Sequence, residues 1–241
     1  MTIPPAQHER RRIYLMRHGS VTYFDALGKP YLPESVPLNE QGRMQATAAG
    51  KSFAQQNIRF DRVIVSGLPR TVETAQRVLA ETGQQIDCET WPELAELRGG
   101  RLSSIPDGEL KQAFTGAFEG LVSEHKQFLG GETIGQLMDR IYPAVDRLRA
   151  DTNWDTVLMV LHGGVNRAIL SYALTGQRLF FGNLAQTAGC INILDVGDEQ
   201  NDWVTRVVNF CPPLPLQSDW RGTTMEALFE QYKKSRPSQI A

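Results

Sequence analysis

The stretch IYLMRHGSV, residues 13–21, places four apolar residues directly before an Arg-His-Gly triplet. A second stretch, TVLMVLHGGV at 156–165, repeats the arrangement, because an apolar run ends in a histidine and two glycines follow. Consecutive apolar residues of this kind are typical of strands that are buried on both faces of a parallel sheet. The chain has only four histidines, and two of them, His18 and His162, stand at equivalent places. We therefore expect two buried strands that each end in a polar, glycine-containing turn.

Outward from these two stretches, predicted strands and helices alternate along the chain. Strands are predicted at 13–16, 60–65, 84–90, 157–161, 190–196 and 203–210, and helices at 40–56, 70–81, 132–150, 165–174 and 225–234. Such alternation predicts the α/β class, as a three-layer α/β/α sandwich with a mostly parallel central sheet. Ligands of these folds bind outside the carboxyl ends of the strands. If the two histidine-bearing strands are neighbours, both imidazoles face one crevice.

Length and composition indicate one soluble globular domain. The chain has 241 residues, with 41% hydrophobic and 22% charged residues, which is ordinary for a globular protein. We expect a flexible N-terminal tail at 1–12 and a single domain at 13–241. An irregular segment at about 101–128 is longer than a routine loop, and we expect it to cover the crevice as an insertion.

Charge and cysteine content exclude several classes of protein. The net charge of −2 provides no general attraction to nucleic acid or to a membrane, and no apolar run reaches the ~18 residues of a transmembrane span. The three scattered cysteines favour a reducing compartment over a disulfide framework, so we expect a cytoplasmic protein. The chain could also form a homodimer.

The predicted strand ends bring together the parts of an anion site. Arg17 and His18 follow one strand, His162 follows another, and SGLPRTVETA at 66–75 places Arg70 on the first turn of a helix after a third. Two guanidinium groups and nearby helix N-termini favour a phosphoryl group. The glycines at 19, 163 and 164 would allow backbone N–H groups to approach it closely.

These residue types also indicate a chemistry. An imidazole nitrogen can attack phosphorus and hold the phosphoryl group covalently, while the guanidinium forks spread the charge of the transition state. The departing oxygen then needs a proton donor. WPELAELRGG, residues 91–100, offers Glu93 and Glu96 after the third strand, again on the carboxyl side.

The combination of motifs resembles the histidine phosphatase superfamily, branch 1, which is the phosphoglycerate mutase-like clan. The resemblance runs from about residue 13 to residue 210 and rests on six segments in the family's order: RHG at 17–19, PLNEQGRMQA at 37–46, SGLPRTVETA at 66–75, LAELRGG at 94–100, GGET at 130–133 and VLHGGVNRA at 160–168.

The resemblance implies a role for each matching position. His18 would be the phosphorylated nucleophile, Glu96 the acid with Glu93 as the runner-up, and His162 the second histidine. The residues implied in phosphate binding are Arg17, Arg70, Gly19 and Gly163. It implies no cofactor and no metal. GGET matches a motif too, but we expect it to form a turn and a helix start rather than to take part in catalysis.

The departures from the family pattern decide between activities. Phe24 occupies the position of an asparagine that often contacts phosphate, and Thr22 or Tyr23 could replace that contact. The long insert of the cofactor-dependent mutases is not recognisable after Glu96, which favours hydrolysis of a phosphomonoester of a small metabolite over mutase transfer. Phosphoglycerate mutase-type phosphoryl transfer is the alternative enzyme hypothesis. A non-catalytic phosphate-binding protein of the same fold is the third.

Overall fold

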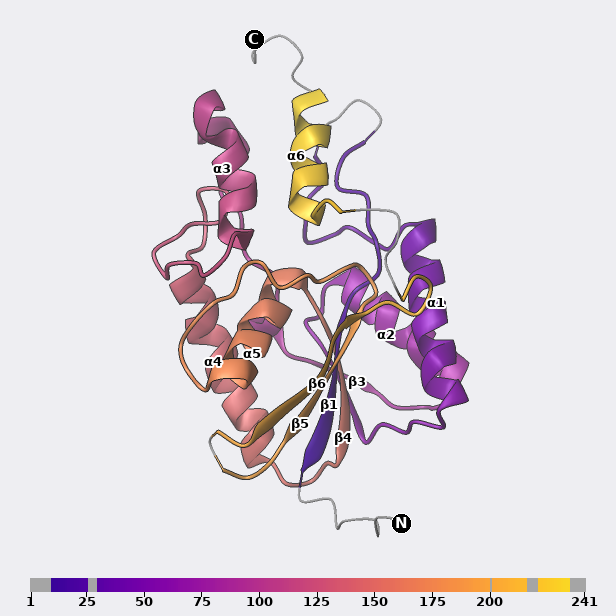
Figure 1. Ribbon diagram of the computed structural model, residues 1–241. Coiled ribbons are helices and arrows are strands. Elements are labelled where there is room, and N and C mark those ends of the chain that lie inside the picture. Colours follow the sequence, from indigo (N-terminus) through magenta and orange to yellow (C-terminus); the bar gives the residue numbers. More distant parts are fainter. Residues whose placement is uncertain (1–9, 26–29, 200, 216–220, 235–241) are drawn as a thin grey trace.

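The computed structural model describes residues 10–25, 30–199, 201–215 and 221–234. Most of the predicted N-terminal tail lies outside the described residues. A six-stranded sheet forms the centre of the molecule, in the order β3-β2-β4-β1-β5-β6 (Figure 1). The strands are β1 (Arg11–Arg17), β2 (Arg62–Val65), β3 (Cys88–Thr90), β4 (Thr156–Leu161), β5 (Ile191–Val196) and β6 (Trp203–Phe210). β3, β2, β4 and β1 run parallel, and β5 and β6 are antiparallel to their neighbours. The mostly parallel sheet predicted from the sequence is confirmed.

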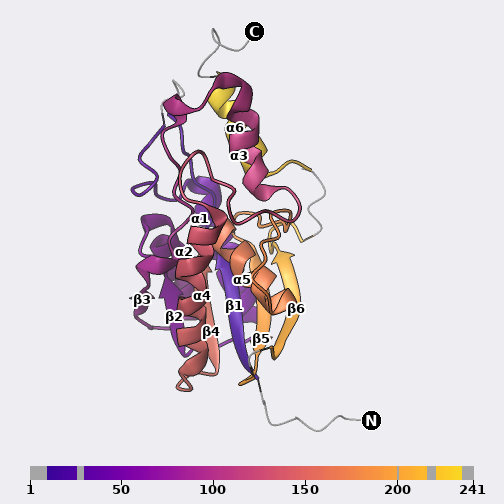
Figure 2. The ribbon, with the colours of Figure 1, turned by 90° about the vertical axis from the view of Figure 1, so that its left-hand side faces the viewer.

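Helices cover both faces of the sheet. The α-helices are α1 (Glu40–Gln55), α2 (Pro69–Thr82), α3 (Leu110–Thr115), α4 (Ile134–Ala150), α5 (Gly163–Thr175) and α6 (Thr224–Lys234), and short 3₁₀ turns are η1 (Pro92–Leu94), η2 (Leu102–Ser104), η3 (Asp107–Glu109) and η4 (Gly116–Phe118). α1 and α2 lie on one side of the sheet and α4 and α5 on the other (Figures 1 and 2). The three-layer sandwich is therefore confirmed.

The alternation of side chains along β1 explains why both faces are covered. Ile13 and Leu15 belong to the apolar core under α4 and α5, whereas Tyr14 and Met16 belong to the core under α1 and α2. Successive side chains of a strand point to opposite faces, so a continuous apolar run requires a helix layer on each side. Among the described residues, no helix has both the length and the apolar character needed to cross a bilayer.

Several element boundaries differ from the prediction by a few residues. β1 begins at Arg11, and β3 is confined to Cys88–Thr90. α4 begins at Ile134 rather than at Glu132, because the side chain of Thr133 caps it and forms a capping box with Gln136. These differences shift no predicted site residue to another element.

The register of β1 against β4 brings the two histidines together. Arg17 is paired with Leu161, and the backbone N–H of His18 donates to the carbonyl of Leu161 at 3.0 Å. His18 directly follows β1, and His162 directly follows β4. Because these two strands are adjacent and parallel, both histidines lie at the carboxyl edge of the sheet. The predicted adjacency of these strands is confirmed.

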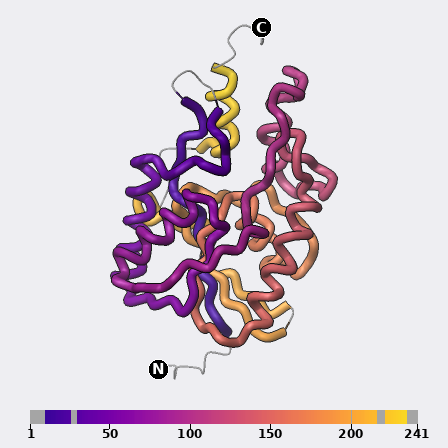
Figure 3. Tube along the Cα trace, turned by 180° about the vertical axis from the view of Figure 1, so that it is seen from behind, coloured from indigo at the N-terminus to yellow at the C-terminus, as the bar shows by residue number. Residues whose placement is uncertain are grey.

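A small helical layer, which we call the cap, stands beyond that edge. It comprises α3 and α6, whose side chains form a third apolar cluster around Leu110, Phe114 and Tyr232. The ring of Phe24, from the loop after β1, also packs near Tyr232, with 6.3 Å between ring centroids. Figure 3 shows this early loop, in indigo, beside the yellow C-terminal helix. Segments from both ends of the chain thus meet above the sheet.

Close packing of α1 on the loop after β1 requires glycine at two positions. A Cβ atom at Gly42 would overlap the carbonyl oxygen of Ser20, and a Cβ atom at Gly19 would overlap the carbonyl of Gly42. α1 itself is fixed there by Asn39, whose side chain accepts from the N–H of Gly42 at 2.9 Å. The loop that follows His18 is therefore held directly against a helix backbone.

We expect Gly42→Ala to lower the free energy of unfolding by about 1–3 kcal/mol, because the added methyl group overpacks this contact. The usual effect of this substitution within a helix has the opposite sign, a gain of roughly 1 kcal/mol. Gly108→Ala is the matched control, since a methyl group there would meet no atom within 4 Å. Urea denaturation of both variants checks the prediction. Equal stability of the Gly42 variant and the wild type would contradict it.

Candidate active site

The imidazole of His18 is oriented by the backbone next to it. Its Nδ1 lies 2.7 Å from the carbonyl oxygen of Gly19, and His18 is buried. A carbonyl oxygen can only accept, so Nδ1 carries the hydrogen in this contact. The lone pair of the neutral ring is then on Nε2. His18 therefore presents a nucleophilic nitrogen whose direction is fixed by a single hydrogen bond.

His162 lies against His18, with 5.2 Å between the centroids of the two rings. The tautomer of His162 is determined by hydrogen bonds to two hydroxyl groups in series. Its Nε2 is 2.8 Å from Ser66 Oγ, which is 3.1 Å from Thr71 Oγ1. Thr71 donates its single hydroxyl hydrogen to the carbonyl of Leu68, so Ser66 must donate to Thr71 and accept from His162 Nε2. The Nδ1 of His162 is thus a lone-pair nitrogen. It is buried, and none of the described residues forms a hydrogen bond with it.

Both imidazoles are held in the neutral form. The pKa of His18 lies well below its usual value because the ring is buried and because Arg70 and Arg17 are close. The pKa of His162 is lowered first by burial and then by the proximity of His18, Arg70, Arg17 and Arg140, since a proton on His162 would be repelled by the arginines and by any proton gained by His18. A neutral His18 is the form that can attack an electrophile, so the site favours the reactive state at neutral pH.

Two guanidinium groups flank the histidines. Arg17 is 8% exposed and Arg70 is 2% exposed, and within the described part of the chain neither forms an ion pair with a carboxylate. Arg17 donates from Nη1 to the carbonyl of Gln186 at 2.5 Å, and Arg70 donates to the carbonyl of Pro33 at 2.6 Å. The Nε atoms of both arginines are buried and have no hydrogen-bond partner among the residues that the structure describes. Buried cations with free donors require an anion, so the arrangement fits a phosphoryl group.

The side chain of Glu96 lies beside His162, against the N-terminus of α5. Its carboxylate accepts from the N–H of Gly164 at 3.1 and 3.2 Å and from the N–H of Leu97 at 2.9 Å. A Cβ atom at Gly164 would lie 2.6 Å from Glu96 Oε1, so a larger residue there would displace the carboxylate. The structure thus brings this predicted carboxylate to the same strand ends as the two histidines.

Glu93 is held elsewhere. Its carboxylate forms a close ion pair with Arg147 on α4. Burial alone would raise the pKa of Glu93, but the hydrogen bond from Arg147, a backbone hydrogen bond and the charge of Arg147 together lower it. A paired carboxylate with a lowered pKa is a poor proton donor, which favours Glu96 between the two candidates.

The two predicted glycines have different surroundings. The N–H of Gly19 donates to Thr74 Oγ1 at 3.1 Å, so this group is already occupied, and Gly19 contributes through its carbonyl contact with His18. Gly163 is the first residue of α5, where backbone N–H groups have no partner within the helix. A Cβ atom at Gly163 would lie 3.5 Å from Arg17 Nε. The helix N-terminus therefore faces the guanidinium group.

The structure adds a residue that the sequence did not indicate. Thr224, the first residue of α6, accepts from Arg17 Nη1 at 3.0 Å. The contact joins residues more than 200 positions apart, and no motif marks it. Phe24, which replaces the family's asparagine, packs in the cap, and the hydroxyl of Thr22 accepts from the Asn39 side chain at 3.3 Å. Arg17 and Phe24 therefore both contact the cap, whereas Thr22 contacts the start of α1.

The model of the histidine phosphatase superfamily (branch 1) matches residues 13–209. The chain belongs to this superfamily. Its relatives include phosphatases: the metal-independent phosphoserine phosphatase of Arabidopsis thaliana is 28% identical over 201 residues, which cover 82% of this chain and 81% of that protein. The family expected from the motifs is therefore confirmed.

Other relatives place the domain in longer proteins. The 6-phosphofructo-2-kinase/fructose-2,6-bisphosphatase of Caenorhabditis elegans is 29% identical over 67% of this chain, and the match covers 34% of that protein. The chain thus spans about a third of such relatives. Among solved structures, a mycobacterial glucosyl-3-phosphoglycerate phosphatase has a TM-score of 0.62 with 24% identity, covering 83% of this chain and 99% of the other. This last similarity shows the shared histidine phosphatase fold.

The lowered pKa of His18 predicts a pH dependence of stability. Between its folded pKa and the ordinary value of about 6.5, the unfolded chain binds the proton and the folded chain does not. Stability therefore falls as pH drops below about 6.5, by up to roughly 1.4 kcal/mol per pH unit for one histidine. We expect His18→Gln to show a shallower fall of the unfolding free energy between pH 7 and pH 5.

His125→Gln is the matched control, because His125 is exposed and its ring stays in water in both states. Urea denaturation at a series of pH values measures the slopes. Parallel curves for the wild type and His18→Gln would contradict a neutral, buried His18.

Proposed function

We propose that the chain is a phosphomonoester hydrolase that acts through a phosphohistidine intermediate on a small phosphorylated metabolite. The observation that carries the proposal is the state of His18. Its Nδ1 is bound to Gly19, and its Nε2 keeps the lone pair. Two buried guanidinium groups lie close by, and no carboxylate of the residues described here pairs with them. Membership of the histidine phosphatase superfamily and the phosphatase relatives support the proposal.

In the first step, His18 Nε2 attacks phosphorus, and the bond from phosphorus to the ester oxygen breaks. Arg17 and Arg70 bind the phosphoryl oxygens and stabilise the charge that develops on them. Glu96 acts as the general acid and gives a proton to the departing oxygen. The bond that forms is P–N and the bond that breaks is P–O, so the product alcohol leaves as a neutral molecule.

In the second step, Glu96 acts as a base. It takes a proton from a water molecule whose oxygen attacks phosphorus, and the P–N bond breaks. Inorganic phosphate leaves, His18 is again neutral, and Glu96 again carries the proton that it needs. His162 Nδ1, a lone-pair nitrogen, would bind a phosphoryl oxygen by sharing the proton that the monoanion of the phosphomonoester brings with it.

We propose that the reaction requires neither a metal ion nor a cofactor. Two guanidinium groups at the phosphate site repel a divalent cation and supply the positive charge that a metal would supply. Among the residues that the structure describes, no group of three or more His, Cys, Asp or Glu side chains is placed to hold a metal.

We further propose that the predicted segment at about 101–128, together with α6, covers the substrate. α3 packs on α6 through Phe114, whose ring lies 5.6 Å from the ring of Phe229. Thr224 then connects α6 to Arg17. We therefore propose that residues of the cap select the leaving group.

Trapping the intermediate tests the proposal. We expect the wild type, incubated with a ³²P-labelled phosphomonoester in excess EDTA and quenched in alkali, to retain label on His18. His18→Ala should retain none and should lose turnover while its circular dichroism is unchanged. Label or phosphate release that persists in His18→Ala would exclude this nucleophile. Absence of label from an inactive wild type would favour the non-catalytic alternative, and activity that depends on a bisphosphorylated primer would favour the mutase.

The choice of leaving group tests Glu96. An alkoxide requires protonation as it leaves, which is worth typically 10²–10⁴-fold, whereas p-nitrophenolate is already a stable anion. Glu96→Gln should therefore reduce hydrolysis of an alkyl phosphate by about 10²-fold or more, while p-nitrophenyl phosphate still gives a burst of p-nitrophenol. Glu93→Gln is the control and should affect both esters mildly and alike. Leaving-group sensitivity in the Glu93 variant instead would move the acid to that residue.

A further inference from the structure

Arg140, on α4, uses its whole guanidinium group to hold the loop that carries Glu96. It donates from Nη1 to the carbonyls of Glu93 and Ala95, both at 2.6 Å, and from Nη2 to the carbonyl of Glu96 at 3.1 Å. Its remaining donors bind Glu132, from Nε at 2.7 Å and from Nη2 at 2.9 Å. All five N–H groups of the side chain are thus occupied.

The loop depends on these bonds for its shape. Between η1, which ends at Leu94, and η2, which begins at Leu102, the chain has no regular secondary structure. Arg140 supplies the donors for three carbonyl groups in four residues, and its side chain is only 15% exposed. Without it these carbonyls would lose their partners in a partly buried place, and the loop would gain conformational freedom.

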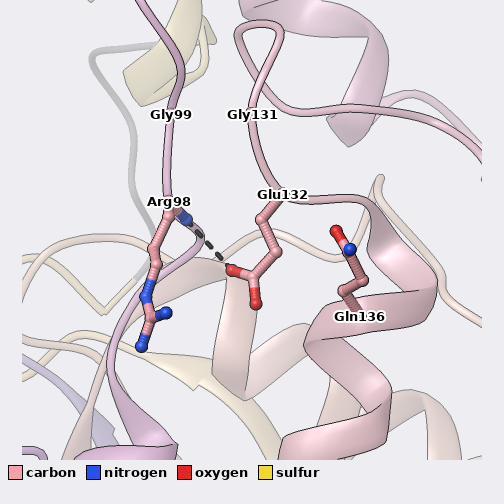
Figure 4. Close-up of a pocket in the computed structure, with 5 residues that line it drawn as sticks. All are labelled: Arg98, Gly99, Gly131, Glu132 and Gln136. Atoms are coloured by element: carbon pink, nitrogen blue, oxygen red, sulfur yellow. Dashed lines mark hydrogen bonds between the residues drawn. The ribbon is translucent and has the colours of Figure 1, made fainter.

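Glu132, from the GGET segment, completes the arrangement. Its carboxylate fixes Arg140 and also accepts from the backbone N–H of Arg98 at 3.1 Å (Figure 4). Its own N–H donates to the carbonyl of Arg98 at 2.8 Å. A Cβ atom at Gly131 would overlap that same carbonyl, which explains a glycine at this point. GGET therefore serves as a support for the 93–98 loop, on the wall of a small open hollow.

We propose that Arg140 is the positioning residue for the general acid: it and Glu132 place the Glu96 carboxylate at the N-terminus of α5, next to His162. The inference rests on the proposed function. Arg140 acts through the loop backbone and does not itself touch the reacting atoms. A misplacement of about 1 Å can cost about 10²-fold in rate, so loss of the arginine should mimic loss of the acid.

The test is a comparison of two esters. Arg140→Met should reduce kcat/KM for an alkyl phosphate by about 10²-fold while the burst of p-nitrophenol from p-nitrophenyl phosphate changes only a few-fold. Arg147→Met is the matched control, because Arg147 lies on the same helix and binds the same loop, but through the Glu93 side chain. That variant should treat both esters alike. If Arg140→Met does not fold, Glu132→Gln replaces it in the test, because it keeps the size of the side chain. We expect it to show a weaker form of the Arg140 effect.

Combination with Glu96→Gln separates positioning from general damage. If Arg140 acts through Glu96, the double variant should hydrolyse the alkyl ester no more slowly than Glu96→Gln alone. Equal losses on both esters in a folded Arg140 or Glu132 variant, or additive losses in the double variant, would overturn the inference. A wild type that never labels His18 would instead refute the proposed function, so the two failures are distinguishable.

Discussion

Two buried guanidinium groups, for which no described residue supplies a carboxylate partner, are the constraint on which this site depends. Removing a charge from water costs several kcal/mol unless another charge or good hydrogen bonds compensate. Arg17 and Arg70 have backbone carbonyl partners, and each keeps a buried Nε free. Burial of the rings, together with these charges, lowers the pKa of His18 and of His162 and holds both in the neutral form. The same feature that demands an anion therefore prepares the nucleophile that would react with it.

The nucleophile and the acid are supported in different ways. His18 and His162 are fixed by the register of β1 against β4, which belongs to the buried sheet. Glu96 lies on a loop without regular structure, and side-chain contacts from α4 give that loop its shape. In the proposed mechanism, the sheet therefore determines where phosphorus would be attacked, whereas a few polar contacts determine where the leaving group would receive its proton.

The parts of the site that follow from local patterns were predictable from the sequence. Apolar runs that end in Arg17, His18 and His162 indicated strands and their polar ends, and parallel neighbours bring such ends together. The contacts of Thr224 and Arg140 were not predictable, because each joins segments far apart in the chain and neither involves a periodic pattern. The choice between Glu93 and Glu96 stayed open for the same reason, since the partner that distinguishes them, Arg147, lies on α4.

Stereochemistry at phosphorus tests the covalent intermediate most directly. A phosphomonoester made chiral at phosphorus with sulfur and ¹⁸O would be hydrolysed in water enriched in ¹⁷O, and the configuration of the released thiophosphate determined. Two successive displacements, first by His18 and then by water, each invert phosphorus, so the account predicts overall retention. Overall inversion would show a single direct attack by water and would contradict a phosphohistidine on the pathway.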